Sequence, residues 1–462
     1  MIGYIEFEDE PRIGDLELNF LKNDNEAYNT IVFAGENGCG KTAILESIAS
    51  FQEGGYLDKH SFVKKVRFFD ENGKEHTILR DKEALRYYKP EGYTEEEWDA
   101  INQHTEQDFY RERFELDSEN PCDIRNFKLV FSEARSGFEV DLSRDVRNGD
   151  YEEAEKYEKE GADYSGIVQL LIDLEEKDNE QYIKYAKLHP KCTYEQYMNN
   201  SRIGRFKKAY ESMFDDLVYI GKDPDQKDDK IYFAKEKKQI DINELSTGEK
   251  QIVFRGADLL YHAKNGATII IDEPELSLHP KWQKKIMDFY RNLFTDESGK
   301  QIAQILIATH SQYVVQSAVA DSDEVKVILL KREAGKIKTN SIQEALLGAH
   351  SCAEINYLVF GVEKIDYHIQ LFGALHKLLQ GIQESGVNDK ISSIDKYIKN
   401  HRLYEPSKHE REDTSHGHYY TLPTYIRNAI DHPENNRTFS DNDLDISIGL
   451  LRDIYKEVPR DK

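Results

Sequence analysis

The feature that most constrains the fold is a glycine-rich segment, GENGCGKT at residues 35–42, which separates a strand-like run from a helix-like run. Residues 30–34 (TIVFA) are apolar and rich in β-branched side chains, which is typical of a strand buried inside a sheet. Residues 42–49 (TAILESIA) continue with helical spacing. Glycines placed here let backbone N–H groups face an anion at the N-terminal end of a helix. The pattern G-x4-G-K-[ST] therefore predicts a strand, a phosphate-binding loop and a helix within an α/β fold.

Three further motifs lie far downstream, at residues 245–251 (LSTGEKQ), 268–273 (TIIIDE) and 309–310 (TH). Ser246 precedes Asp272 by 26 residues (272 − 246), and His310 follows Asp272 by 38 residues (310 − 272). The second motif is an apolar run that ends in two acids, as expected for a buried strand that delivers carboxylates to a sheet edge.

These motifs carry groups suited to nucleotide hydrolysis, with ATP and Mg²⁺ as the expected ligands. Lys41 would reach the β- and γ-phosphates, and Thr42 with Asp272 would hold Mg²⁺ and its hydration shell. Glu273 would act as general base for the attacking water, and His310 would contact the γ-phosphate. The residues expected around the phosphates are Gly35, Asn37, Gly38, Gly40, Lys41 and Thr42.

In this order and spacing the motifs resemble those of the ABC-type ATPases, in particular the branch that includes the SMC, RecF and OLD-like proteins. The resemblance covers about residues 1–50 and 236–340. It implies an α/β ATPase head with a mixed or largely parallel sheet and flanking helices. In that family the signature serine and glycine close over the γ-phosphate bound by the opposite subunit, so Ser246 and Gly248 are expected to act in trans. The resemblance therefore implies a dimer at minimum.

Two other parts of the family's pattern are placed less directly. Glu275, Ser277 and His279 follow the second motif in a segment that resembles the family's D-loop. The glutamine of the Q-loop is not obvious: its function has two candidate positions, Gln52 or the segment 132–135 (SEAR) that follows an expected strand at residues 127–131.

Changes in composition along the chain predict four parts. Residues 1–55 and 236–345 carry the motifs and are expected to form the two lobes of the ATPase core. Residues 56–235 are polar, charged and rich in tyrosine, and we expect a mostly helical insertion. Residues 346–462 are expected to form a helical C-terminal region.

Helical spacing supports the last two assignments. Residues 167–174 place apolar side chains three and four positions apart, but no heptad pattern is sustained as in a coiled-coil arm. Ser440 is expected to cap a helix near the C-terminus, and its apolar stripe contains Leu444, Ile448, Leu451 and Tyr455.

The composition excludes several classes of protein. With 87 acidic and 62 basic residues the net charge is −25, so no broad basic surface indicates nucleic-acid binding. Four widely spaced cysteines argue against a structural zinc site or a disulfide framework. No apolar run approaches the ~20 residues of a membrane span, and the N-terminus lacks a signal peptide. We therefore expect a cytoplasmic protein without a membrane partner.

An ATPase domain of this type does not by itself determine the biological function of the protein. The chain has no sustained coiled coil and no glutamate-then-DxD constellation of a Toprim nuclease. What remains resembles the stand-alone ATPases of bacterial anti-phage systems, most of all the PARIS subunit AriA and next the Septu ATPase PtuA. The resemblance implies an oligomeric ATPase that holds a separate nuclease effector, of Toprim type, until a phage trigger protein is sensed.

Two alternatives stay open. Residues 427–432 (RNAIDH) resemble the R-x4-H motif of HEPN ribonucleases, although Arg411 and His416 share that spacing. On one ideal helix Arg427 and His432 point about 140° apart, so they converge only if His432 lies past the helix end. The other alternative is a DNA-binding ATPase that uses the basic clusters at residues 64–67 and 205–208.

Overall fold

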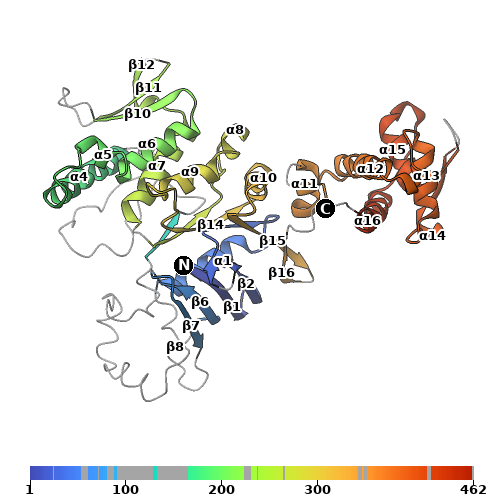
Figure 1. The fold of residues 1–462 in the computed structure, drawn as a ribbon, viewed down its shortest axis with the longest axis horizontal. Helices are drawn as coiled ribbons and strands as arrows, with labels where there is room; N and C mark the ends of the chain where they lie inside the picture. The colour runs from blue at the N-terminus through green and yellow to red at the C-terminus, as the bar shows by residue number, and fades with distance from the viewer. Residues whose placement is uncertain are drawn as a thin grey trace. The chain divides into compact units, whose positions relative to one another are not determined.

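The computed structural model describes residues 1–23, 25–53, 61–70, 72–80, 88–90, 128–132, 165–222, 230–236, 238–263, 266–333, 335–341, 346–347, 351–413 and 418–459. The chain forms two compact units, Met1–Asn340 and Ser341–Lys462 (Figure 1). None of the helices in the described residues has the length and apolar character that a membrane span requires.

A six-stranded sheet forms the centre of the first unit, in the order β16-β15-β5-β14-β13-β9. Its strands are β5 (Thr30–Ala34), β9 (Leu129–Ser132), β13 (Thr268–Asp272), β14 (Gln304–Thr309), β15 (Val325–Glu333) and β16 (Lys336–Ser341). Every neighbouring pair from β15 to β9 is parallel, and a short turn leads from β15 to the edge strand β16. The expected fold class, an α/β core with a mixed sheet and helices on its faces, is confirmed.

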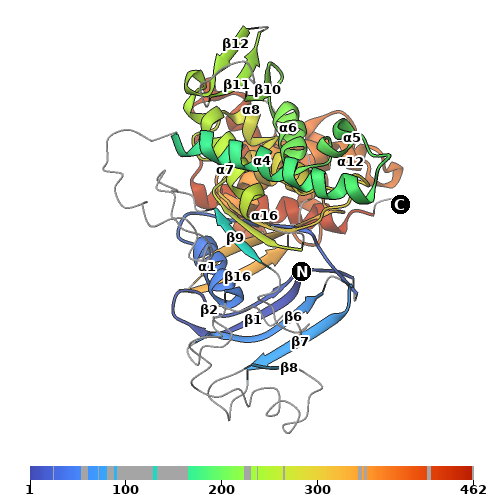
Figure 2. The same ribbon diagram turned by 90° about the vertical axis from the view of Figure 1, so that its left-hand side faces the viewer.

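A second, antiparallel sheet faces the first across helix α1 (Lys41–Gln52), as Figure 2 shows. Its order is β2-β1-β6-β7-β8, with β1 (Ile2–Glu10), β2 (Gly14–Asn19), β6 (Val63–Phe69), β7 (Glu75–Arg80) and β8 (Tyr88–Pro90). Ile44 and Ile48 of α1 are fully buried in a core shared with Phe68 of β6 and Leu306 of β14. The helix that follows the phosphate loop is thus held between two sheets. A small ribbon of β3 (Leu21–Asn23) and β4 (Glu26–Ala27) completes this side.

Helices cover the rest of the first unit. They are α4 (Ser165–Leu188), α5 (Tyr194–Met198), α6 (Arg202–Met213), α7 (Thr247–His262), α8 (Pro280–Gln283), α9 (Ile286–Leu293) and α10 (Gln312–Ala320). Helix α10 packs on β5 and β15, α7 packs on β9, and α4 and α6 pack on α7. A three-stranded sheet of β10 (Leu217–Lys222), β11 (Ile231–Lys235) and β12 (Lys238–Asp241) follows α6, and the turn η3 (Ile242–Glu244) leads into α7.

Residues 56–235, expected to be a mostly helical insertion, are divided between several structures. Strands β6, β7 and β8 belong to the antiparallel sheet and β9 to the central sheet, while α4–α6, β10 and β11 form a separate layer. The charged residues that hid the strand pattern lie on partly exposed positions and pair with acids. Arg67 of β6 binds Glu75 of β7 at 2.7 Å, and Lys64 binds Glu6 of β1 at 2.6 Å.

The second unit is mainly helical. It contains α11 (Cys352–Phe360), α12 (Lys364–Gln380), α13 (Ile391–Asn400), α14 (Pro406–His409), α15 (Leu422–Asp431) and α16 (Asp441–Glu457). The turns η5 (Gln383–Ser385) and η6 (Pro433–Asn435) and a hairpin of β17 (Glu410–Asp413) and β18 (Tyr419–Thr421) connect them. Ser440 caps α16 as expected, and Leu444, Ile448 and Leu451 are buried.

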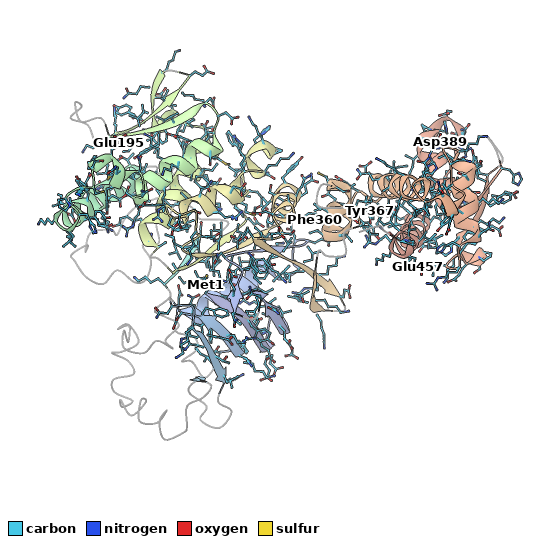
Figure 3. The ribbon with its side chains drawn as sticks, viewed as in Figure 1. Met1, Glu195, Phe360, Tyr367, Asp389 and Glu457 are labelled. Atoms are coloured by element: carbon cyan, nitrogen blue, oxygen red, sulfur yellow. The ribbon has the colours of Figure 1, made fainter. Side chains whose placement is uncertain are left out.

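A buried polar cluster fastens α11 to α12 and α16. The Glu354 carboxylate accepts hydrogen bonds from the backbone N–H groups of Leu346 and Leu347, both at 2.7 Å, and from the Tyr367 hydroxyl at 2.9 Å. Arg452 of α16 lies 3.5 Å from the same carboxylate. Tyr367, labelled in Figure 3, is fully buried. Because a buried carboxylate is tolerated only when it is paired, this cluster fixes how the three helices pack.

Gln304 ties the two sheets of the first unit together, and we expect its replacement to be destabilising. Its Oε1 accepts from Ile2 N at 2.7 Å, and its Nε2 donates to Ile2 O at 2.8 Å and Tyr28 O at 3.0 Å. Gln304→Leu removes these bonds inside the core and should lower the free energy of unfolding by about 3 kcal/mol. Urea unfolding measures this, with the exposed Gln380→Leu as control, expected to change by less than about 0.5 kcal/mol. Equal effects of the two variants would contradict the assignment.

His368 of α12 makes the second unit sensitive to acid. The ring is fully buried, Nε2 lies 2.8 Å from Ser447 Oγ, and burial lowers the pKa of His368 to about 3. The unfolded chain, with a histidine pKa of about 6.5, binds a proton that the native state rejects. Stability is therefore complete well above the pKa of the unfolded chain and falls as the pH decreases below it, by about 2 kcal/mol between pH 7 and pH 5.

Hydrogen exchange of peptides from α12 and α16, measured at pH 7 and pH 5 and corrected for intrinsic exchange, checks this dependence. The double variant His368→Leu, Ser447→Ala should lose most of the difference between the two pH values. If the variant retains the whole pH dependence, another group is responsible.

Candidate nucleotide site at the carboxyl edge of the central sheet

The central sheet brings the separated motifs to one edge. Thr309 of β14 pairs with Ala34 of β5, and Ala308 pairs with Asp272 of β13. Because the strands are parallel, the residues that follow them leave the sheet on the same side. The loop 35–40, Glu273 and His310 are therefore neighbours in space.

The glycine loop that follows β5 depends on residues without a side chain. Gly40 is the N-cap of α1, with φ at +97°, and a Cβ there would collide with the Ile337 side chain. A Cβ at Gly35 would collide with the carbonyl oxygen of Leu330. Arg332 of β15, which the sequence did not single out, supports this loop by donating to Gly38 O at 3.1 Å.

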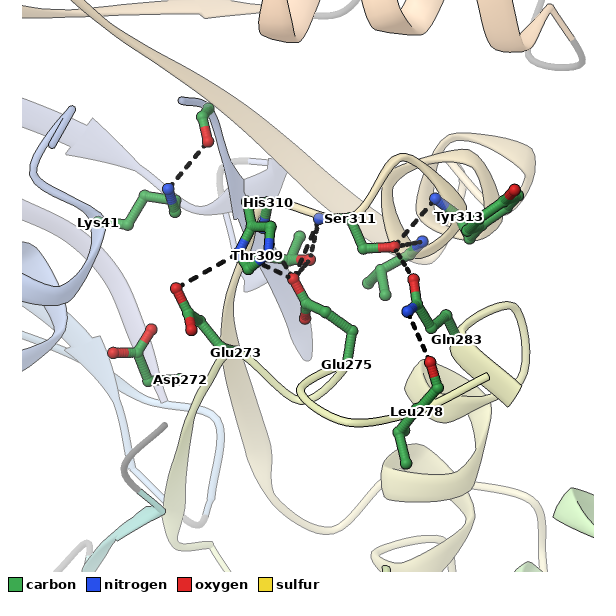
Figure 4. Close-up of polar contacts among 12 residues, drawn as sticks. Lys41, Asp272, Glu273, Glu275, Leu278, Gln283, Thr309, His310, Ser311 and Tyr313 are labelled. Carbon is green, nitrogen blue, oxygen red and sulfur yellow. Dashed lines mark hydrogen bonds and ion pairs between the residues drawn. The ribbon is translucent and has the colours of Figure 1, made fainter. Parts of the chain in front are cut away.

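Lys41 and Thr42, the first residues of α1, face different partners. Lys41 Nζ is buried and donates to Gly35 O at 2.9 Å and to Glu36 O at 3.0 Å, so it lies inside the glycine loop (Figure 4). Thr42 Oγ1 donates to Asp272 Oδ2 at 2.8 Å. The two residues expected to hold Mg²⁺ are thus in direct contact.

Asp272 is the buried acid of the site, with 4% of its surface exposed. Burial raises the pKa of its carboxyl group, the Thr42 hydrogen bond opposes this, and the neighbouring Glu273 raises it further. Within the described residues Asp272 Oδ1 has no hydrogen-bond partner. A hydroxyl and a carboxylate with an unpaired oxygen are ligands that suit Mg²⁺, which keeps most of its waters and also binds phosphate oxygens. The residues present therefore fit a Mg²⁺–nucleotide complex.

Glu273 has an unusual backbone conformation. Its φ is +44°, in the left-handed region that costs a non-glycine residue on the order of 1–3 kcal/mol. Its N–H donates to Ala308 O at 2.9 Å. Arg255 of α7, with 1% of its surface exposed, donates to the carbonyls of Asp272 and Glu273, both at 3.4 Å. Arg255 was assigned no role from the sequence; the available signal was a single charge within the otherwise apolar run 252–257.

His310 lies beside two carboxylates. Its Nδ1 is 3.3 Å from Glu273 Oε1 and 3.4 Å from Glu275 Oε1, and 41% of its side chain is exposed (Figure 4). A ring that carries a proton on Nδ1 can donate to either carboxylate, and a fully protonated ring also donates from Nε2. The structure thus brings Lys41, Thr42, Asp272, Glu273 and His310 together at one edge of the sheet.

Ser246 and Gly248 lie elsewhere in the unit, at the start of α7. Ser246 is the N-cap and forms a capping box with Glu249. A Cβ at Gly248 would lie 3.2 Å from Ser277 O and 3.3 Å from the Trp282 ring, so this helix end abuts the D-loop-like segment. No hydrogen bond within the described residues connects Ser246 or Gly248 to residues 35–42.

The geometry separates the two candidates for the Q-loop. Gln52 lies 11 residues after Lys41 in α1 (52 − 41), about 16 Å along the helix axis, and its side chain is buried. Ser132 ends β9 and lies beside Ile271 of β13, at the edge that carries Asp272. This edge position favours the second candidate, whose residues 133–135 lie outside the described residues.

The residues of the alternative sites have nearby acidic partners. Arg427 Nη2 lies 2.6 Å from Asp431, and His432, just past the end of α15, lies 3.3 Å from Glu434. Arg411 binds Asp443 at 3.1 Å, and His416 lies outside the described residues. In the first of the two basic clusters Lys64 and Arg67 pair with acids of neighbouring strands, and in the second burial lowers the pKa of Arg205.

The chain is similar to two curated defence proteins over short segments. It is 29% identical over 143 residues to "Septu protein PtuA" of Bacillus mycoides (strain KBAB4), which covers 29% of this chain and 19% of that protein. It is 32% identical over 101 residues to "Retron Vc95 probable ATPase" of Vibrio cholerae, covering 20% and 18%. The matched segments thus span about a fifth of each relative.

Among solved structures, the SMC head domain from Thermotoga maritima matches with a TM-score of 0.41 and 12% identity, over 74% of this chain and 99% of that chain. The Smc head domain bound to the C-terminal domain of ScpA from Pyrococcus furiosus has a TM-score of 0.38 and 16% identity, over 75% and 97%. The model of one family matches residues 31–316, a range that contains the glycine loop, Asp272 and His310. The chain therefore belongs to the ATPase family described as "AAA domain, putative AbiEii toxin, Type IV TA system".

Proposed function

We propose that this protein is the ATPase subunit of a bacterial anti-phage defence complex and that it hydrolyses ATP at the edge of the central sheet. The observation that supports this best is the joint placement of the glycine loop, the Thr42–Asp272 contact and the Glu273–His310 pair. Each group has the chemistry that phosphoryl transfer to water requires.

In this proposal the chain's own residues perform the following steps. Backbone N–H groups of residues 35–42 hold the β- and γ-phosphates, and Lys41 exchanges the loop carbonyls for phosphate oxygens. Thr42 and Asp272 would hold Mg²⁺, and the ion would supply positive charge that offsets the charge developing on the phosphates. Glu273 accepts a proton from the attacking water, and His310 donates to the γ-phosphate.

The second part of the proposal is a dimer in which the signature residues act in trans. Ser246 and Gly248 stand at the N-terminus of a 16-residue helix, whose partial positive charge suits a phosphate. They make no hydrogen bond to the glycine loop of their own chain within the described residues. We therefore propose that this helix end contacts the nucleotide bound to the glycine loop of a second copy of the chain.

The defence role rests on sequence similarity to a Septu protein and a retron ATPase. We propose that the ATPase works with a separate nuclease effector, of Toprim type, and responds to a phage trigger protein. Similarity to a Septu protein supports the class of defence ATPases as a whole. It fits a PARIS-type subunit such as AriA and a Septu-type subunit equally. Co-purification of the native complex from the source cell, followed by mass spectrometry, identifies the effector: a Toprim nuclease supports the PARIS type.

Substitutions at the two halves of the site test the mechanism. Glu273→Gln should bind ATP with unchanged affinity, lower kcat roughly 10²- to 10⁴-fold and stabilise an ATP-bound dimer, because the water loses its base. Ser246→Arg should also bind ATP but not hydrolyse it, because a bulky cation blocks the second subunit's approach. ATP affinity, steady-state hydrolysis and light scattering measure the three properties.

Mixing two inactive variants distinguishes trans from cis completion of the site. Suppose that each site takes its glycine loop from one subunit and its signature residues from the other. A dimer of one Lys41→Ala chain and one Ser246→Arg chain then contains one site in which both parts are intact. The mixture should therefore recover part of the hydrolysis that each variant lacks. No recovery from mixed dimers that are shown to form would contradict the trans arrangement.

The ribonuclease alternative is tested independently of ATP. The position of His432 just past α15 meets the geometric condition for convergence with Arg427, although each has an acidic neighbour in the structure. In our proposal the purified chain does not cleave tRNA in EDTA. Cleavage that disappears in the variant Arg427→Ala, His432→Ala would instead assign a HEPN-like nuclease to the second unit.

A further inference from the structure

Glu275 is buried beside the catalytic pair with a hydrogen-bond arrangement that its position in a loop does not require. Only 3% of its surface is exposed. Its Oε1 accepts hydrogen bonds from the Thr309 hydroxyl at 2.7 Å, from His310 N–H at 2.9 Å and from Ser311 N–H at 3.0 Å. One carboxylate oxygen thus holds three consecutive residues of the loop that follows β14.

The second oxygen of this carboxylate is not needed to hold the loop. The three donors of the loop bind one oxygen, which an uncharged side chain could also supply. Glu275 Oε2 is buried and has no hydrogen-bond partner within the described residues. Burying a carboxylate with one unpaired oxygen is costly, whereas an amide of the same size could accept from the same donors. A purely structural residue would avoid this cost, so the negative charge itself has a use at this site.

The surrounding hydrogen bonds make the arrangement rigid. Ser311 caps α10, and its hydroxyl donates to Gln283 Oε1 at 2.7 Å. Gln283 Nε2 in turn donates to Leu278 O at 2.9 Å (Figure 4). The loop that carries His310 is therefore fastened to the loop that carries Glu275 on both sides of the histidine.

His310 is the group on which the charge of Glu275 acts. Its Nδ1 is almost equally distant from Glu273 Oε1, at 3.3 Å, and from Glu275 Oε1, at 3.4 Å. While His310 donates to Glu273, that carboxylate is engaged as an acceptor. When His310 donates to Glu275 instead, the Glu273 carboxylate is available to take a proton from water.

We propose that Glu275 is a positioning residue, which orients His310 and withdraws it from Glu273 so that Glu273 can act as the base. This inference rests on the proposed ATPase function and adds to it a residue that does not touch the substrate. In this arrangement the Nδ1–H group keeps its proton and changes only the carboxylate to which it donates. The chemistry of hydrolysis is unchanged.

The test compares Glu275→Gln, which keeps the size and the acceptor but removes the charge, with the wild type. ATP affinity and KM should stay within about twofold, and kcat should fall roughly 10- to 100-fold, as for a misplaced catalytic group. The matched control is Glu297→Gln, an exposed glutamate in a turn after α9, expected to behave as wild type. Glu275→Ala, which also removes the three hydrogen bonds, should lower both kcat and the melting temperature.

A second measurement separates positioning through His310 from a general structural effect. In a His310→Ala background, Glu275→Gln should lower kcat by less than about twofold further, because the two residues act as a unit. If Glu275→Gln lowers kcat in that background by as much as it does in the wild type, the proposal is wrong. It is also wrong if KM and the melting temperature change in proportion to kcat. Wild-type kcat in Glu275→Gln also overturns it, whereas a wild-type protein without ATPase activity overturns the proposed function instead.

Discussion

The parallel pairing of β5, β14 and β13 is the constraint on which the site depends. In this pairing Ala34, Thr309 and Asp272 reach the same edge of the sheet, although 230 residues of sequence separate Thr42 from Asp272 (272 − 42). Parallel strands require long crossover connections, so distant sequence motifs can converge only if the intervening chain packs outside the sheet. The chain between these strands does pack outside the sheet, as helix α1 on one face and as α7, α9 and α10 elsewhere on the core.

Buried polar groups hold this edge of the sheet in place. Arg255 fixes the carbonyls of Asp272 and Glu273 from α7, Glu275 fixes the loop after β14, and Gln304 joins the two sheets. Each of these side chains would destabilise the core if its partners were missing. Together they keep Glu273 in a left-handed conformation that its own backbone disfavours.

Most of the site could be predicted from the sequence because its residues belong to short local patterns. The apolar runs at residues 30–34 and 268–272 are β-branched, and the glycines at residues 35–40 have a recognisable spacing. The strands at residues 63–80 were not predicted, because Lys64 and Arg67 mask their alternation and find their acidic partners only across strands. Arg255 was missed because its hydrogen-bond acceptors are backbone carbonyls, which leave no trace in a sequence.

The sequence by itself determined which chemical groups are present and in what order, since those depend on residue type and local spacing. Only the tertiary structure decided which groups meet. It placed His310 between Glu273 and Glu275, placed Gln52 far from the glycine loop, and directed Ser246 and Gly248 to the D-loop-like segment. The physical reason is that strand register and helix packing set distances between residues that are remote in the chain, and no local pattern contains those distances.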